Sequence, residues 1–303
     1  MIDMKTKILF TLSPLFIFSL FIFNVRNAEA VTITKIEDSL NQIGNYYYQN
    51  ELAGKKIEWR YELDKKPNSV SSNAVVYYTP DSQSFKLNKT KSDLVYVGEN
   101  EFTNSTEVEQ TNITTDFAKE VTRTASTSTT KGFTINGEGL AFKLPLSIGS
   151  NQITGSFNSS TTNTQTEATT ETITSGAQSV KVPPHKTYRV VVSLEQIEFE
   201  GTVDYTATGK DLKNNINATG WWIDITGRPY TKRFDLSYSI GSEWNSLNNQ
   251  QKNEIKEIKI NSNNNTMTVD GQAEIRGVTG TRMIVKTYDI TNKNNILINQ
   301  KFL

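Results

Sequence analysis

Residues 131–160 read KGFTINGEGLAFKLPLSIGSNQITGSFNSS, and this stretch decides the fold. Near both ends of it, odd-numbered positions are apolar or small and even-numbered positions are polar. An alternation with period two is typical of a strand whose two faces meet different surroundings. The apolar or small set is Phe133, Ile135, Gly137, Gly139, Ala141, Ile153, Gly155 and Phe157. The polar set is Thr134, Asn136, Glu138, Gln152, Thr154 and Ser156.

The two runs are symmetric about Pro145. The symmetry predicts a hairpin that turns there and pairs Phe133 with Phe157, Ile135 with Gly155 and Gly137 with Ile153. Large apolar residues crowd the expected turn, and burying each contributes roughly 1.5–3 kcal/mol. These residues of the expected tip are Leu140, Phe142, Leu144, Leu146 and Ile148.

Each arm offers about ten residues, the length that a tilted strand needs to cross a bilayer. Such alternation, with aromatic residues near one interface, is the signature of a transmembrane β-hairpin. The apolar set and the tip are then predicted to face lipid, and the polar set to line a pore lumen. A lone hairpin would leave backbone groups unpaired in lipid, so several chains must close a barrel. Barrels begin at about eight strands, which requires at least about four chains. An ordinary half-buried hairpin in a soluble β-sandwich is the alternative.

Residues 1–30 are predicted to be a secretory signal peptide. Lys5 and Lys7 precede an apolar run at 8–23, and Ala28-Glu29-Ala30 suits cleavage before Val31. A retained membrane anchor is the alternative. The remaining chain has nearly balanced charge, which gives no indication of a nucleic-acid partner. It contains no cysteine, so disulfides and thiol chemistry are excluded.

Two Thr- and Ser-rich stretches, 111–130 and 159–175, flank the expected hairpin. β-Branched threonine favours strands and tolerates water on both faces, so we expect long polar strands. Toward the N-terminus, apolar residues at helical spacing predict a short amphipathic helix over 34–49. Strand-like runs follow at 57–63, 74–79, 84–87 and 94–97.

Beyond the second Thr-rich stretch, Val180 and Val182 lead into Pro183-Pro184, and strand-like runs occupy 188–194 and 197–205. This order of polar strand, glycine-bearing amphipathic hairpin, Thr-rich strand and paired strands resembles the aerolysin-like β-pore-forming toxins. More narrowly, it resembles the epsilon-toxin and mosquitocidal-toxin family. The resemblance is strong over 111–209, and 266–290 is similar to the family's closing sheet.

The resemblance implies a mainly β, elongated aerolysin-like architecture of long antiparallel strands, with a small α/β head domain and an amphipathic insertion hairpin. The expected parts are a signal peptide at 1–30, a head at 31–110 with 209–250, a central pore-forming domain at 111–208 and a C-terminal β-sandwich part at 251–303. It implies a secreted toxin that binds a surface receptor, protein or glycan, and acts at the target plasma membrane as an oligomer of about seven protomers.

Aromatic residues of the head are the candidate receptor-binding group: Tyr46, Tyr47, Tyr48, Trp221, Trp222 and Tyr230, with Trp244 nearby. Clustered exposed rings can stack on sugars or meet a protein. The alternative is that they pack beneath the head, with Trp221 and Trp222 on opposite faces of one strand. Better-known family members carry a C-terminal extension that proteases remove. Here the last expected strand is 295–302, and Lys55-Lys56 and Lys65-Lys66 are possible cleavage sites.

Catalysis has little support in the sequence. His185 follows two prolines and has no metal-binding companion at short spacing, and no nucleophile elbow, phosphate loop or zinc-protease helix occurs. We therefore expect a protein that is not an enzyme and needs no cofactor or metal. The second hypothesis is a secreted lectin-like protein that binds glycans and never inserts. A glycosidase is a weaker third option.

Overall fold

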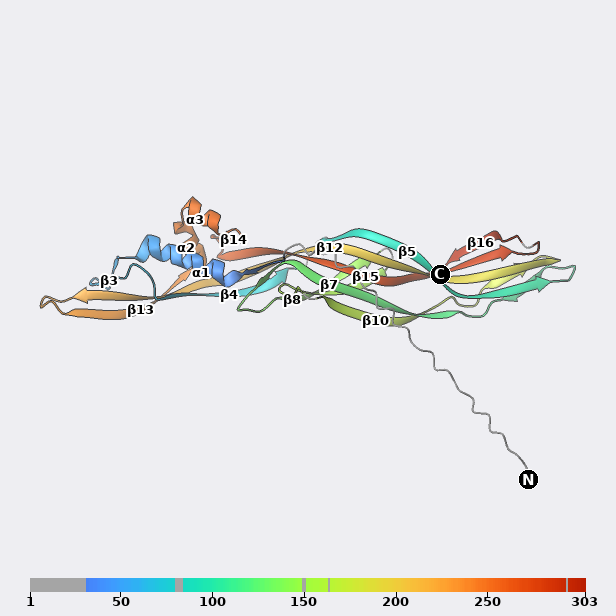
Figure 1. The fold of residues 1–303 in the computed structure, drawn as a ribbon, viewed down its shortest axis with the longest axis horizontal. Helices are drawn as coiled ribbons and strands as arrows, with labels where there is room; N and C mark the ends of the chain where they lie inside the picture. The colour runs from blue at the N-terminus through green and yellow to red at the C-terminus, as the bar shows by residue number, and fades with distance from the viewer. Residues whose placement is uncertain (1–30, 80–83, 149–150, 163, 293) are drawn as a thin grey trace, which may run out of the picture.

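The computed structural model of the protein describes residues 31–79, 84–148, 151–162, 164–292 and 294–303. The molecule is long and narrow, and its main strands run along its length (Figure 1). The predicted signal peptide lies outside the described residues. The mainly β, elongated architecture predicted from the sequence is confirmed.

The organising strand is β12 (Lys186–Ile223), which has 38 residues and runs most of the length of the molecule. One of its edges pairs first with β15 (Thr266–Asp289) and then with β13 (Pro229–Ser239). The other edge pairs in turn with β5 (Phe85–Asn104), β4 (Ser69–Thr79) and β3 (Tyr61–Leu63). Alternate β12 side chains are buried over most of this length, because period two aims every second residue at the core.

The remaining elements extend this sheet or cover it. They are β1 (Thr32–Lys35), α1 (Ile36–Tyr47), the π-helix η1 (Tyr48–Leu52), β2 (Lys56–Ile57), β6 (Gln110–Ile113), β7 (Ala118–Thr134), β8 (Ala141–Ile148), β9 (Asn151–Asn158), β10 (Gln165–Thr174), β11 (Ser179–Val182), α2 (Ile240–Ser246), α3 (Asn249–Glu254), β14 (Ile258–Asn261) and β16 (Ile296–Phe302). Among the described residues, no helix is long and apolar enough to cross a membrane.

The Thr-rich stretches form strands, as predicted. β7 and β10 pair in antiparallel register over ten residue pairs, from Gln165 opposite Thr127 to Thr174 opposite Ala118. Hydroxyl groups face each other across the pair, as between Ser126 and Thr166 at 2.8 Å. β10 is mostly exposed, which explains why threonine and glutamate suit it.

Three apolar cores follow one another along the long axis. The head core contains Tyr48, Tyr61 and Phe234. The middle core joins α1 and α2 to β12, β15 and the hairpin β8–β9. The third core, at the opposite end, contains valines of β11 and β12 with Met283. The molecule is therefore held together by long shared strands, and each core packs only its own section.

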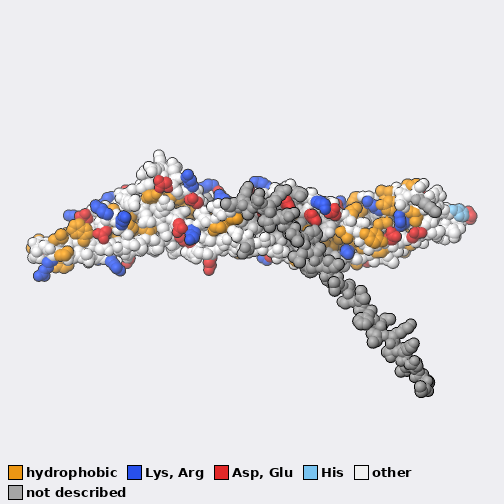
Figure 2. Space-filling model, in the orientation of Figure 1, with side chains coloured by type: hydrophobic (Ala, Val, Ile, Leu, Met, Phe, Trp, Pro, Cys, Tyr) orange, Lys and Arg blue, Asp and Glu red, His pale blue; other side chains and the backbone are white. Residues whose placement is uncertain are grey.

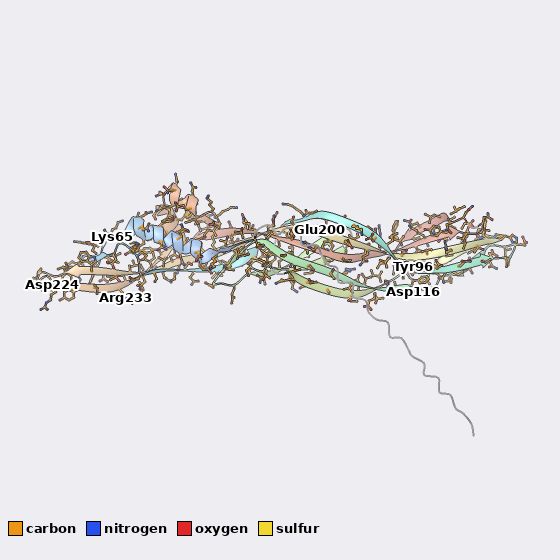
Figure 3. The ribbon with its side chains drawn as sticks, in the orientation of Figure 1. Lys65, Tyr96, Asp116, Glu200, Asp224 and Arg233 are labelled. Carbon is orange, nitrogen blue, oxygen red and sulfur yellow. The ribbon has the colours of Figure 1, made fainter. Side chains whose placement is uncertain are left out.

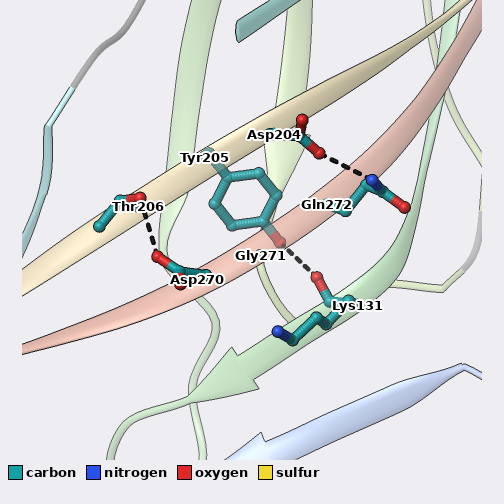
Figure 4. A pocket seen from close by; sticks show the side chains of 7 residues that line it. All are labelled: Lys131, Asp204, Tyr205, Thr206, Asp270, Gly271 and Gln272. Atoms are coloured by element: carbon teal, nitrogen blue, oxygen red, sulfur yellow. Dashed lines mark hydrogen bonds between the residues drawn. The ribbon is translucent and has the colours of Figure 1, made fainter. Parts of the chain in front are cut away.

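Close packing in the middle core depends on glycine. The Tyr205 ring lies directly over Gly271 of the neighbouring strand, where a Cβ atom would come within 2.2 Å of it. The Tyr205 hydroxyl donates a hydrogen bond to the carbonyl oxygen of Lys131 at 3.1 Å (Figure 4). Burial raises the pKa of Tyr205 to about 12. This ring therefore connects β12, β15 and the end of β7 at the place where the hairpin packs.

Candidate functional site

The chain reverses at Asn136-Gly137, within the segment for which the sequence predicted one uninterrupted strand. The N–H of Ile135 donates to the Glu138 carbonyl at 2.8 Å, and the N–H of Glu138 donates back at 2.9 Å. Asn136 and Gly137 have φ of 50° and 78°, the left-handed values of a type I′ turn. The predicted first strand is therefore wrong. Asn-Gly is a strong hairpin signal, and the polar–apolar alternation continues through it without marking the turn.

The amphipathic hairpin consists instead of β8 and β9. Its register pairs Phe142 with Phe157, Leu144 with Gly155 and Leu146 with Ile153. The predicted turn at Pro145 and the predicted pairs are therefore wrong. Pro145 lies opposite Thr154 within β8, with its side chain exposed. A proline lacks an N–H, and an edge strand tolerates that loss.

The two faces of this hairpin differ completely. The inner face is buried, and it carries Phe142, Leu144, Leu146, Ile148, Ile153, Gly155 and Phe157. The outer face carries Ala141, Lys143, Pro145, Ser147, Gln152 and Thr154, all exposed. Four of the five residues predicted to crowd a tip thus lie on a continuous apolar face, and the fifth, Leu140, is half-buried just before β8. Phe133 is also buried, but it belongs to β7.

The inner face packs on the body mainly through aromatic rings. Phe142 stacks on Tyr78 at a centroid distance of 4.0 Å and contacts Tyr205 at 4.9 Å. Phe142 also stacks on Phe157 of its own hairpin at 5.2 Å. Gly155 faces Ile275 of β15. The hairpin therefore covers the apolar surface of β4, β12 and β15.

Polar attachment of the hairpin is limited to a few side chains. The Thr129 hydroxyl donates to the Asn158 carbonyl at 2.6 Å, and the Thr127 hydroxyl donates to the Ser156 carbonyl. At the root, buried Ser159 donates to the Phe133 carbonyl at 2.8 Å and accepts from the Leu140 N–H at 2.8 Å. Among the described residues, no backbone–backbone hydrogen bond joins 141–158 to another strand of the sheet.

Glu167 of β10 contacts the polar face of the hairpin. Its carboxylate accepts a hydrogen bond from the Ser156 hydroxyl and forms an ion pair with Lys143 at 3.3 Å. The Ser156 hydrogen bond is the main reason that the pKa of Glu167 lies below its ordinary value. Glu167 therefore connects both strands of the hairpin to β10.

The predicted lumen residues occupy different settings. Thr134 ends β7, Asn136 and Glu138 belong to the tight turn, and Gln152 and Thr154 point outward from β9. Gly137 also lies in this turn, Gly139 follows it, and Ile135 is half-buried. Lys143 was not singled out from the sequence, because the hairpin was read in a different register.

The pocket in Figure 4 is no candidate for metal chemistry. Its carboxylates Asp204 and Asp270 are paired with Lys86 and Lys259, each at 2.7 Å. Within the part of the chain that the structure describes, no group of three or more His, Asp or Glu side chains is arranged to hold a metal ion.

In the head, the three consecutive tyrosines at 46–48 expose little of their side chains to solvent. Tyr48 is fully buried and its hydroxyl donates to the Asp64 carbonyl at 2.8 Å, so its assignment to receptor binding is wrong. Tyr47 is half-buried against Tyr238, and burial raises its pKa to about 12. Tyr46 is half-buried and donates to Glu254. Helical geometry turns consecutive residues toward different directions, and η1 places Tyr48 inside.

The far end of the head presents more aromatic surface. Trp221 and Trp222 lie on opposite faces of β12, and Trp222 stacks on Tyr230 at 5.2 Å. The Arg60 guanidinium lies 5.1 Å from the Trp222 ring centre and 5.3 Å from that of Trp59. Trp244 packs instead against the middle core. No local pattern in the sequence indicates that Trp59 is exposed, because its turn at 58–60 contains no glycine or asparagine.

Comparison with known proteins identifies the family. The family model described as Clostridium epsilon toxin ETX/Bacillus mosquitocidal toxin MTX2 matches residues 64–298. The Mpp75Aa1.1 β-pore-forming protein from Brevibacillus laterosporus has a similar structure, with TM-score 0.57, 20% identity, and coverage of 89% of this chain and 95% of that one. A non-toxic crystal protein from Bacillus thuringiensis also has a similar structure, with TM-score 0.56 and 15% identity, and the match covers 88% of this chain and 98% of that one.

At these identities the two structures establish the fold alone. A comparison with curated protein sequences finds no match. The family model spans more than half of the chain. The protein therefore belongs to the ETX/MTX2 family, the aerolysin-like β-pore-forming toxins that its sequence resembles.

Proposed function

We propose that the protein is a secreted toxin that binds a receptor on a target cell, oligomerises there and inserts β8–β9 from each protomer into the plasma membrane. The observation that supports this most strongly is the state of the hairpin. It is amphipathic, it has its own backbone ladder, and it packs on the body through apolar side chains and a few hydrogen bonds from hydroxyl groups, without sharing a strand ladder with the main sheet among the described residues. It can therefore leave without breaking any main-sheet ladder among the described residues.

Insertion exchanges one apolar contact for another. In the docked state the inner face meets Tyr78, Tyr205 and Ile275, and in the inserted state it would meet lipid. The free backbone edges of the hairpin must pair with other hairpins, because lipid offers no hydrogen-bond partner. β8 and β9 have eight residues each, and Leu140 and Ser159 bring them to about the nine that a tilted spanning strand needs. The protomer number of about seven remains what the family resemblance implies.

The register of β8 and β9 supports a different lumen residue from the one that the sequence suggested. Apolar residues of β8 have even numbers, whereas Phe133 and Ile135 have odd numbers. In one uninterrupted strand these two sets would lie on opposite faces. We infer that the spanning part is 140–159, with Lys143 in the lumen and Glu138 outside the row of lumen residues.

Lys143→Glu is therefore expected to shift ion selectivity strongly toward cations, because it reverses one charge per protomer inside the pore. Glu138→Gln, the matched control, should leave selectivity nearly unchanged. Reversal potentials in planar bilayers under a salt gradient measure both. A large shift with Glu138→Gln and none with Lys143→Glu would contradict this lumen assignment.

The proposed function is tested by dye release from cells that bind residues 31–303, with and without trypsin. Leu144→Asp should abolish release, because a carboxylate would face lipid, and it should leave cell binding intact. Ser147→Asp, on the outer face of the same strand, should release dye. A ring-shaped, SDS-resistant oligomer should accompany release.

A secreted glycan-binding protein that never inserts is the second candidate, favoured by the exposed rings at the end of the head. Binding to susceptible cells without oligomer or dye release, with or without trypsin, would support it and contradict insertion.

A further inference from the structure

We propose that the free end of the head binds directly to a lipid bilayer, entering its headgroup region end-on. The part concerned, called here the head tip, consists of the β2–β3 turn at 58–60 and the end of the β12–β13 hairpin at 221–230. The inference rests on the proposed function only in placing the protein at a membrane.

The head tip holds the most exposed large apolar side chains among the residues that the structure describes. Of the large apolar residues that the structure describes, Ile225 and Trp59 have the highest exposed fractions, 104% and 80%. Both lie at one end of the long axis, where Asp224 is labelled in Figure 3. Orange side chains reach the same end in Figure 2, among basic ones. A monomer gains nothing in water from this arrangement, and such patches mark interaction sites.

Apolar groups occur on both faces of the tip. Trp222 and Tyr230 lie on one face of the β12–β13 ribbon, while Trp221 and Ile223, 40% and 52% exposed, lie on the other. Ile225 occupies the loop between the strands. A sugar would stack on one aromatic face of the ribbon, and a rigid protein partner would cover only one side of it. A fluid interface surrounds an inserted end on every side, which suits this distribution better.

Several polar groups of the tip loop are paired within the loop itself. The Asp224 carboxylate accepts hydrogen bonds from the Thr226 N–H at 2.8 Å, the Thr226 hydroxyl at 2.7 Å and the Arg228 N–H at 2.9 Å. The N–H groups of Asp224 and Gly227 are also paired within the loop, each at 3.0 Å. These internal hydrogen bonds lower the cost of moving the loop from bulk water into a headgroup layer, where water still reaches the remaining groups.

The rings and cations of the tip match the chemistry of a headgroup layer. Tryptophan and tyrosine favour the membrane–water interface, where an apolar ring and a polar edge are both accommodated. Arg60, against three rings, and Arg228, beside the loop, can meet lipid phosphates. Glu58 and Trp59 both have positive φ, 48° and 57°, an unfavourable backbone for such residues. This conformation holds Trp59 in solvent and fits a functional role.

Flotation with receptor-free vesicles tests the inference, using phosphatidylcholine vesicles and vesicles that also contain phosphatidylserine. The native chain from residue 31 should float with both, and its tryptophan emission should shift to the blue. Ile225→Asp and Trp59→Ser should each reduce the bound fraction about tenfold at subsaturating lipid. Tyr96→Ser removes another exposed ring, from the section of β5 beside the third core and away from the head tip, and should bind as the native chain does.

The outcomes separate this inference from the proposed function. Vesicle binding that depends on Trp59 and Ile225 supports it, even when no dye is released. If vesicles do not bind, while cells bind and lyse, a protein or glycan receptor holds the head and the inference is overturned. Equal loss with Tyr96→Ser would also overturn it, because the effect would then not belong to the head tip.

Discussion

Bridging the hairpin to β10 is expected to abolish pore formation. In the double variant Ser156→Cys/Glu167→Cys, the two thiols replace side chains that are hydrogen-bonded in the docked state, and no other cysteine exists in the chain. A short bismaleimide can therefore join β9 to β10 selectively. The bridged protein should bind cells but release dye at least about a hundredfold more slowly, because the hairpin cannot leave.

The matched control shares one position with that variant. Lys143→Cys/Ser156→Cys places both thiols on the hairpin, at residues that face each other across β8 and β9. Bridging this pair should leave dye release nearly unchanged, because the two strands remain partners during insertion. The unbridged forms of both variants serve as references. Full release from the bridged Ser156–Glu167 protein would show that the hairpin does not undock.

Replacing Glu243 by glutamine is expected to stabilise the protein strongly at high pH. Glu243 is fully buried in α2, and burial raises its pKa to about 8, although Asn214 donates a hydrogen bond to it at 2.5 Å. Its other carboxylate oxygen has no hydrogen-bond partner among the described residues. Because the pKa is higher in the folded state than in the unfolded one, near 4.5, stability is full below about pH 4.5 and falls as pH rises through 8.

Glutamine keeps the neutral form at every pH, so the pH-dependent loss should disappear. Each unit of pKa difference corresponds to about 1.36 kcal/mol, so the gain in unfolding free energy at pH 9 should be several kcal/mol, with little gain at pH 4.5. Urea unfolding at both pH values measures it. Glu120→Gln removes the same charge from an exposed site on β7 and should change stability by less than about 0.5 kcal/mol. A Glu243→Gln gain that is equal at both pH values would refute the titration.

The sequence predicted the fold better than it predicted the site. Alternation and the Thr-rich stretches predicted individual strands, because each strand's pattern is local. The elongated antiparallel architecture came from the resemblance to a known family that the order of these elements carries. The register of the hairpin was predicted wrongly. Large apolar residues have odd numbers up to Ile135 and even numbers from Leu140 to Ile148, and only the Asn136-Gly137 turn separates the two patterns. Giving that dipeptide more weight than the symmetry about Pro145 would have corrected the register.

The surface of the head depended on long-range contacts. Tyr48 becomes buried because η1 turns it toward Tyr61 and Leu63, and no local pattern signals that. Trp59 becomes exposed through two left-handed residues that sequence rules do not assign to Glu and Trp. The opposite facing of Trp221 and Trp222, by contrast, follows from strand geometry alone.

The docking of β8–β9 by side chains also determines when it can open. Undocking in water would uncover two surfaces at once, the apolar face of the hairpin and the rings of Tyr78 and Tyr205 beneath it. Each buried residue of the hairpin contributes roughly 1.5–3 kcal/mol to the barrier that water imposes. In the proposed mechanism, this cost would keep a solitary molecule in its soluble form. Lipid or neighbouring chains would then have to be available to cover the apolar face before the hairpin leaves.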